Sequence, residues 1–164
     1  MSVTIKRDGW GQVEPNHLSA PRNGQVYAQL PAAEDIAQLQ QGMFVKYDYA
    51  NGECNFTGNG RWVMVYNEEK LYDERHQMHK DFVYDVNDFF DGKMYPRVFA
   101  IVPGDIYTTN MVAEAAYKAG DTLVVGADGI LAAGAPVAGE LAFEVAAETT
   151  MPDGQPAVKL RAIA

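Results

Sequence analysis

The hydrophobic positions of this chain fall mostly into short runs of β-branched and aromatic residues separated by turn-forming dipeptides. In the last third, such runs lie within the segments 119–131, 140–145 and 151–163, and the first and last of these segments contain an Asp-Gly dipeptide. Asp-Gly flanked by alternating hydrophobic residues is typical of a tight hairpin turn. The pattern therefore predicts β-strands joined by hairpins.

Two similar runs lie in the middle of the chain, at 43–49 and 61–66. They are rich in aromatic and β-branched residues, which strands favour, and the glycine-rich stretches 51–52 and 58–60 between them tolerate positive φ. The segment 95–112 continues the pattern on both sides of a Pro-Gly-Asp turn. We predict an all-β or β-dominated fold, a small barrel or sandwich.

One short helix is expected at 34–41. Pro31 stands near its start, acidic residues in the first turn favour the positive end of the helix dipole, and Gly42 provides a stop signal. Ile36 and Leu39 would share one face of this helix, which we expect to cover an open end of the barrel or to lie across a sheet.

Residues 1–30 are rich in Gly, Pro, Asn and Gln and contain only isolated apolar residues. Because ordering the backbone costs about 1–2 kcal/mol per residue, so sparse a set of apolar groups is not expected to hold a core of its own. We predict an extended N-terminal arm that lies on its own domain or becomes ordered only against a neighbour. Trp10, between two glycines, is the candidate anchor, and Val3, Ile5 and Tyr27 complete the candidate partner interface.

A chain of 164 residues is long enough to bury a core in one domain. We expect residues 31–164 to form a β-rich domain, for which a division into two lobes, 31–95 and 96–164, is one alternative. The charged segment 68–91 fits neither the helical nor the strand period, so we expect a long surface excursion with a turn of helix.

The chain is acidic, with 22 Asp and Glu residues against 13 Lys and Arg residues and a formal net charge of −9. No basic cluster is available to neutralise phosphates, so direct nucleic-acid binding is not expected. No apolar run approaches the roughly 20 residues that span a bilayer, and no leader-like segment begins the chain, so we expect no membrane partner. Cys54 is the only cysteine, which excludes an intramolecular disulfide and a cysteine-based zinc site.

His76 and His79 form the one cluster of metal-ligand residue types, with acidic residues nearby. Two imidazoles three residues apart share a helix face and, with a carboxylate, can bind zinc, which would suit a small metal-dependent hydrolase. In so polar a stretch, solvated surface histidines are the preferred interpretation. The only serines, Ser2 and Ser19, lie in the predicted arm, where no catalytic triad is expected. We predict a protein that is not an enzyme and that carries no metal or other cofactor.

Aromatic side chains are frequent in the middle strands. Trp62, Tyr47, Tyr49 and Tyr66 would line a sugar-stacking platform if they shared one face of a sheet. Tyr47 and Tyr49 are two positions apart and therefore point to the same face. Packing in the core is the preferred interpretation, and a carbohydrate-binding or host-surface-binding module is the alternative.

Three segments, 103–110, 119–131 and 148–161, resemble the small virion structural proteins of tailed bacteriophages, especially capsid decoration (cement) proteins. The resemblance is one of style, because it consists of Gly-Asp turns and Asp-Gly hairpins between short strands. The middle segment 43–95 matches no motif of that family.

This resemblance implies a non-enzymatic virion protein that binds the outer surface of a phage head. Its partner would be the major capsid protein, across the boundaries between capsid subunits, and possible further partners are copies of the chain itself, as a trimer or another homo-oligomer. The protein would be made in the host cytoplasm and located on the capsid surface. A terminal arm ordered on the shell is common in such proteins, and residues 1–30 would suit that role.

Overall fold

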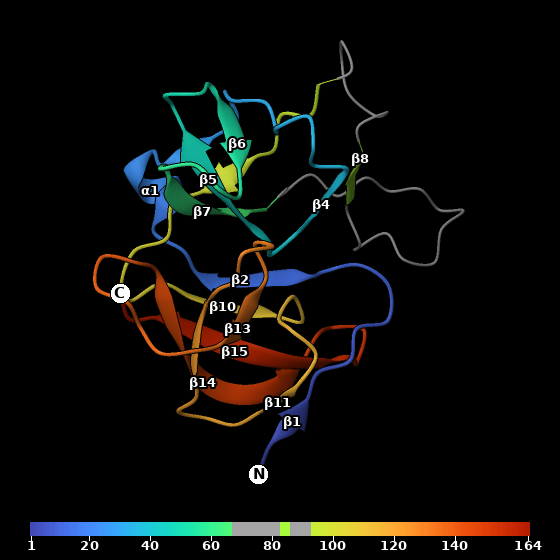
Figure 1. The fold of residues 1–164 in the computed structure, drawn as a ribbon. Helices are drawn as coiled ribbons and strands as arrows, with labels where there is room; N and C mark the ends of the chain where they lie inside the picture. Colours follow the sequence, from blue (N-terminus) through green and yellow to red (C-terminus); the bar gives the residue numbers. More distant parts are fainter. Residues whose placement is uncertain (67–82, 86–92) are drawn as a thin grey trace.

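Two antiparallel β-sheets lie one above the other in the computed structural model, which describes residues 1–66, 83–85 and 93–164 (Figure 1). The order of the six-stranded sheet is β13 (Leu131–Ala133), β12 (Thr122–Val125), β14 (Ala142–Thr150), β15 (Pro156–Ala162), β10 (Ile106–Thr109) and β2 (Val13–His17). The order of the five-stranded sheet is β3 (Val26–Tyr27), β9 (Val98–Phe99), β7 (Arg61–Val65), β5 (Phe44–Asp48) and β6 (Glu53–Asn55). The all-β class predicted from the hydrophobic runs is confirmed.

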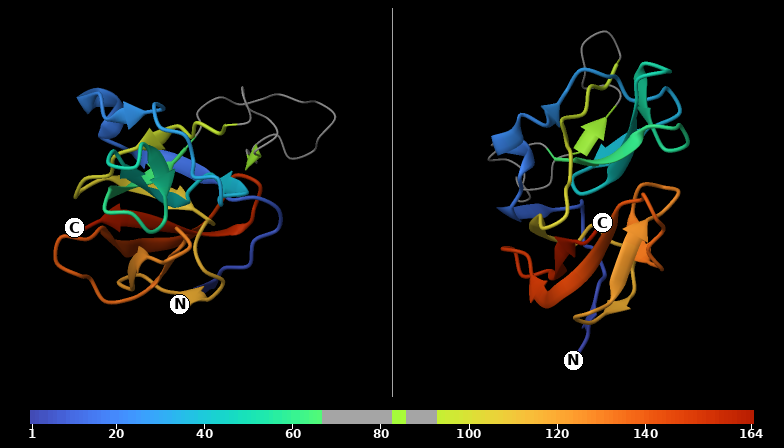
Figure 2. Two further views of the ribbon diagram at one scale, coloured as in Figure 1. Left: turned by 45° about the horizontal axis from the view of Figure 1, so that its top comes forward. Right: turned by 90° about the vertical axis from the view of Figure 1, so that its left-hand side faces the viewer.

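Two strand pairs complete the described elements: β1 (Val3–Thr4) with β11 (Ala116–Tyr117), and β4 (Gln38–Gln40) with β8 (Val83–Asp85). The two sheets and their connections are seen from other sides in Figure 2. No helix in the part of the chain that the structure describes is long and apolar enough to cross a membrane.

The six-stranded sheet is curled. A parallel bridge pairs Val112 with Leu131, and the Ala113 N–H donates to the Leu131 carbonyl at 2.7 Å. Val112 follows β10 in the chain, and Leu131 begins β13. This bridge therefore connects strands near the two opposite edges of the sheet. The concave side is filled by fully buried side chains, among them Tyr107, Leu123, Phe143, Val158 and Leu160.

The five-stranded sheet is buried on both faces. Phe44, Met64 and Phe99 belong to the core that it shares with the six-stranded sheet, where the rings of Phe44 and Phe143 lie 5.6 Å apart. Val63 points to the opposite face, together with other alternating residues, and packs in a second cluster. Strands buried on both faces read as continuous apolar runs, which explains the aromatic and aliphatic composition of the middle of the chain.

The helix predicted at 34–41 is wrong. In the structure this segment contains a turn followed by β4, and its apolar residues Ile36 and Leu39 are buried in the second cluster. Antiparallel pairing of β4 with β8 satisfies its backbone groups instead, so a tertiary contact overrides the local helical signals. The described residues contain one helix, α1 (Ala20–Asn23), and Gly24, with a φ of +67°, caps its C-terminal end.

Residues 1–30, predicted as an extended arm, do not form a separate element. These residues contribute β1, β2, α1 and β3, and Ile5 is only 1% exposed. Of the two alternatives for this segment, it lies on its own domain. Its sparse apolar groups need no core of their own, because they fill a core built by the C-terminal strands.

The division into lobes at 31–95 and 96–164 follows the sheets only in part. β9 lies beyond residue 95 but belongs to the five-stranded sheet, while β2 lies before residue 31 but belongs to the six-stranded sheet. The charged segment 68–91 lies outside the described residues except for Val83–Asp85, which forms a strand.

Candidate functional site

Trp10 lies on the connection between β1 and β2 and is 39% exposed. Gly9 before it has a φ of +86°, which favours glycine. The N–H of Gly11 after it donates to Gln40 Oε1 at 2.8 Å, and a Cβ at Gly11 would stand 2.5 Å from the Gln41 carbonyl oxygen. The two glycines thus hold a large aromatic side chain at the surface in a defined place.

A group of four polar residues fastens this connection to the hairpin between β14 and β15. We call Gln12, Asn110, Asp153 and Gln155 the polar clasp. The Gln12 side-chain amide donates to Asp153 Oδ2 at 2.7 Å, and its backbone N–H donates to Asn110 Oδ1 at 2.7 Å. The Asp8 N–H donates to Gln155 Oε1 at 3.0 Å. The tip of a C-terminal hairpin therefore holds the segment that carries Trp10.

The carboxylate of Asp153 is the acceptor at the centre of the clasp. Its burial would raise its pKa, but the hydrogen bonds from Gln12 and Gln155 outweigh that effect, and the pKa is lowered from the ordinary value of 3.8. A hydrogen bond to the charged form of a carboxyl group favours that form. The clasp is therefore built on an ionised side chain at neutral pH.

The other three residues of the predicted partner interface do not join Trp10 on one exposed surface. Ile5 is fully buried in the shared core, and Val3 is half-buried against the same core. Tyr27 is half-buried against the second cluster. Ile5 is therefore not available to a partner in this fold, and Trp10 is the large exposed side chain of the set.

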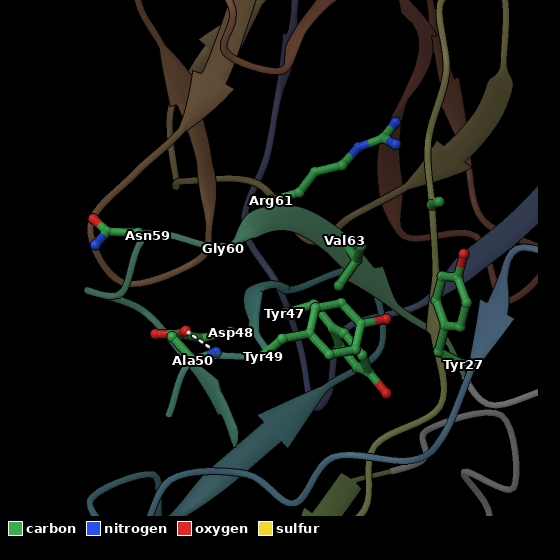
Figure 3. Close-up of a pocket in the computed structure, with 10 residues that line it drawn as sticks. Tyr27, Tyr47, Asp48, Tyr49, Ala50, Asn59, Gly60, Arg61 and Val63 are labelled. Carbon is green, nitrogen blue, oxygen red and sulfur yellow. Dashed lines mark hydrogen bonds between the residues drawn. The ribbon is translucent and has the colours of Figure 1, made fainter. Parts of the chain in front are cut away.

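A second surface feature is a pocket of about 390 Å³ beside the five-stranded sheet, shown in Figure 3. We call it the tyrosine pocket. The ring of Tyr47 lies 5.5 Å from that of Tyr27 and 5.2 Å from that of Tyr49, the latter edge to face. The lining residues are Tyr27, Tyr47, Asp48, Tyr49, Ala50, Asn59, Gly60, Arg61, Val63 and Ala100.

Tyr47 is the fixed centre of this pocket. Its hydroxyl oxygen accepts the N–H groups of Gln29 and Leu30, each at 3.1 Å. Burial raises the pKa of this phenol, so it stays neutral across the physiological range. Two hydrogen bonds and burial hold its ring in one orientation between Tyr27 and Tyr49.

Asp48 orders the turn that follows β5. Its carboxylate accepts the backbone N–H groups of Ala50 at 3.1 Å and Asn51 at 3.3 Å. It also accepts the side-chain amides of Asn51 at 2.7 Å and Asn55 at 3.3 Å. The side-chain hydrogen bond from Asn51, then that from Asn55, lower the pKa of Asp48. This carboxylate is ionised and already surrounded by donors.

Two glycines are needed beside the pocket for reasons of space. A Cβ at Gly58 would stand 2.1 Å from Asp48 Oδ2, and one at Gly60 would stand 2.4 Å from the Tyr47 carbonyl oxygen. Neither residue has a positive φ, in contrast to Gly52, where φ is +68°. The 51–52 turn therefore uses the positive φ that glycine tolerates, whereas Gly58 and Gly60 are required by space.

The four aromatic residues of the alternative platform, Trp62, Tyr47, Tyr49 and Tyr66, do not share one face of the sheet. Trp62 and Tyr66 pack against the shared core, whereas Tyr47 lies in the second cluster on the other face of the sheet. The expectation that Tyr47 and Tyr49 share a face is confirmed by their ring contact. Sequence reasoning missed Tyr27 as a residue of the tyrosine pocket, because only the pairing of β3 with β9 places it beside Tyr47.

Two nucleophilic side chains, those of Cys54 and Ser19, have structural partners. Cys54 is fully buried, its burial raises the pKa of the thiol to about 12, and its Sγ lies 3.6 Å from the Leu30 carbonyl oxygen. The Ser19 hydroxyl donates to Asp105 Oδ1 at 2.6 Å. The thiol is therefore protonated and shielded, and the serine hydroxyl is engaged next to α1.

Within residues 1–66, 83–85 and 93–164, no three His, Cys, Asp or Glu side chains are placed to hold a metal ion. His76 and His79, the candidate zinc ligands, lie outside the described residues. The metal hypothesis therefore stays a prediction.

Comparison of the chain with protein-family models, with curated proteins and with solved structures gives no match.

Proposed function

We propose that the protein is a non-enzymatic decoration protein that binds the outer surface of a phage head and stabilises the shell across capsid subunit boundaries. One observation carries the proposal. The three segments that resemble decoration proteins contain β10, β12, the end of β14 and most of β15, which are neighbours in the six-stranded sheet. The hairpin of β14 and β15 holds the connection that presents Trp10.

The turns that carry the resemblance are of two repeated kinds. At the Gly-Asp turns, Asp105 and Asp121 each donate a backbone N–H to the carbonyl three residues earlier, at 3.1 Å in both cases. Each carboxylate in return accepts the N–H of that earlier residue, at 3.1 Å for Asp105 and 2.9 Å for Asp121. The preceding glycines have φ values of +97° and +93°.

The two Asp-Gly turns share a different arrangement. Asp128 and Asp153 each accept the N–H of the second residue after them, at 3.0 and 3.1 Å. Side chains that mimic a backbone turn in this way are typical of Asx turns. The features that resemble decoration proteins are thus repeated local structures within one sheet, which supports treating them as one binding module.

Trp10 suits the role of an anchor for the capsid. Tryptophan is enriched among the few residues that carry most of the binding free energy at protein interfaces. Its position is fixed before binding by Gly9, Gly11 and the polar clasp, so little conformational entropy is lost when a partner covers it.

Stabilisation of the shell would follow from linkage. A ligand that binds only the assembled state adds its binding free energy to that state. A decoration protein seated across a subunit boundary meets this condition, and the symmetry of a head multiplies a modest contact over many copies.

The test is co-sedimentation of the full-length protein with heads assembled from the major capsid protein of a phage that encodes this chain. We expect the native protein to sediment with the heads, and Trp10→Ala to bind at least about tenfold more weakly. Tyr95→Ala is the matched control, because Tyr95 is 40% exposed and Trp10 is 39% exposed. Absence of the native protein from the pellet would overturn the proposal.

A further inference from the structure

The tyrosine pocket takes no part in the proposed contact through Trp10, and its chemistry is that of a binding site. Pockets for small ligands have mainly apolar and aromatic walls and a few polar groups at defined positions. Tyr47, Val63 and Ala100 are among the lining residues, and the ring of Tyr49 lies next to that of Tyr47 (Figure 3). Tyr49 is 69% exposed, the largest exposed aromatic surface among the described residues.

The walls of the pocket are formed before any ligand arrives. Tyr47 is held by two N–H donors, Asp48 by four, and Gly58 and Gly60 pack so closely that neither has room for a side chain. A rigid pocket loses little conformational entropy on binding. The site is therefore suited to a ligand of defined shape.

The polar groups at the rim are mostly neutral. Within the described part of the chain, no hydrogen bond occupies the Tyr27 hydroxyl, the Tyr49 hydroxyl or the Asn59 side-chain amide, all of which belong to pocket-lining residues. The two charged lining residues are opposite in sign and already engaged. Asp48 accepts four hydrogen bonds, and Arg61 donates to the Ile101 carbonyl at 2.7 Å.

A ligand that fits this arrangement has an apolar face for a tyrosine ring and hydroxyl groups around its edge for the rim. A pyranose ring has both, because its axial C–H groups form an apolar face and its equatorial hydroxyls both donate and accept hydrogen bonds. We infer that the tyrosine pocket binds one pyranose residue of a neutral glycan. The proposed decoration protein would then carry a glycan-binding site apart from its capsid contact.

The test is saturation-transfer NMR of the full-length protein with four soluble probes: maltotriose, cellotriose, mannotriose and chitotriose. We expect at least one trisaccharide to receive saturation, most strongly at the C–H protons of one face of a single ring. Tyr49→Ala is expected to weaken that binding at least tenfold, while Tyr95→Ala, which alters an exposed tyrosine outside the pocket, leaves it unchanged.

The inference is overturned if none of the four probes receives saturation from the native protein, or if Tyr49→Ala binds as tightly as the native protein. It is also overturned if Tyr49→Ala abolishes head binding while the native protein binds no trisaccharide, because the pocket would then take a capsid side chain. The capsid proposal is tested separately through Trp10, so either can fail alone.

Discussion

The side-chain amide of Gln12 donates a 2.7 Å hydrogen bond to the carboxylate of Asp153, a residue 141 positions further along the chain. This bond joins the N-terminal connection that carries Trp10 to the tip of the last hairpin. The surface proposed to contact a capsid is therefore assembled from both ends of the sequence. Because residues 1–30 contain β2 and several core residues, their removal would delete these together with Trp10.

Loss of the polar clasp is expected to increase the mobility of the Trp10 side chain. In a Trp62→Phe background, where Trp10 is the only tryptophan, Asp153→Ala should lower the fluorescence anisotropy of Trp10 and reduce stability by about 1 kcal/mol. Asp128→Ala is the control, since Asp128 accepts the N–H of the second residue after it, as Asp153 does, but has no hydrogen bond to the N-terminal segment. Equal anisotropy in both variants would contradict a role for the clasp in fixing Trp10.

Stability is expected to fall in acid because of three carboxyl groups. The pKa values of Asp48 and Asp153 are lowered from 3.8 and that of Glu148 from 4.5, the last mainly by the Ala119 N–H. A lowered folded-state pKa contributes stability above the unfolded-state value and loses it as pH falls through the folded-state value. Urea denaturation should therefore show constant contributions from these groups above about pH 5 and a decline below about pH 4.

The pH prediction has a direct control. Asp48→Asn removes one of the three titrating groups, so the loss of stability between pH 5 and pH 3 should be smaller than in the native protein. An undiminished loss in this variant would show that the Asp48 carboxylate does not contribute.

Two buried tyrosines are expected to respond oppositely to loss of their hydroxyl groups. The Tyr107 hydroxyl is buried with no hydrogen-bond partner in the described structure, whereas that of Tyr117 donates to the Ala113 carbonyl at 2.8 Å. Tyr107→Phe should leave the unfolding free energy unchanged or raise it by up to about 1 kcal/mol, because an unpaired polar group is removed. Tyr117→Phe should lower it by about 1 kcal/mol in the same urea titration. Equal destabilisation by both changes would refute the difference.

Gly60 is expected to tolerate alanine less well than Gly52. A Cβ at Gly60 would stand 2.4 Å from a backbone oxygen of Tyr47, while Gly52 has open space and only a positive φ. Gly60→Ala should cost about 1–3 kcal/mol through overpacking, and Gly52→Ala about 1 kcal/mol through backbone strain. Thermal unfolding of the two variants shows which one is less stable. A larger loss of stability in Gly52→Ala would show that the glycine at 60 is not required by space.

Parts of the tyrosine pocket were accessible to sequence reasoning and parts were not. The two-residue spacing of Tyr47 and Tyr49 correctly placed them on one face, because side chains alternate along a strand. The same rule says nothing about Tyr27, which reaches the pocket through pairing of β3 with β9. Trp62 and Tyr66 have the same aromatic character but lie on the opposite face of the sheet.

What the sequence determined by itself is the set of turns and the all-β class. Gly-Asp and Asp-Gly turns form from hydrogen bonds within three residues, as at Asp121 and Asp128, so no distant part of the chain is needed. Tertiary structure alone decided that 34–41 contains a strand in place of a helix, that residues 1–30 enter the core, and that Tyr27 joins the pocket. Each of these outcomes depends on burial and strand pairing between residues far apart in the sequence, and those contacts outweigh weak local propensities.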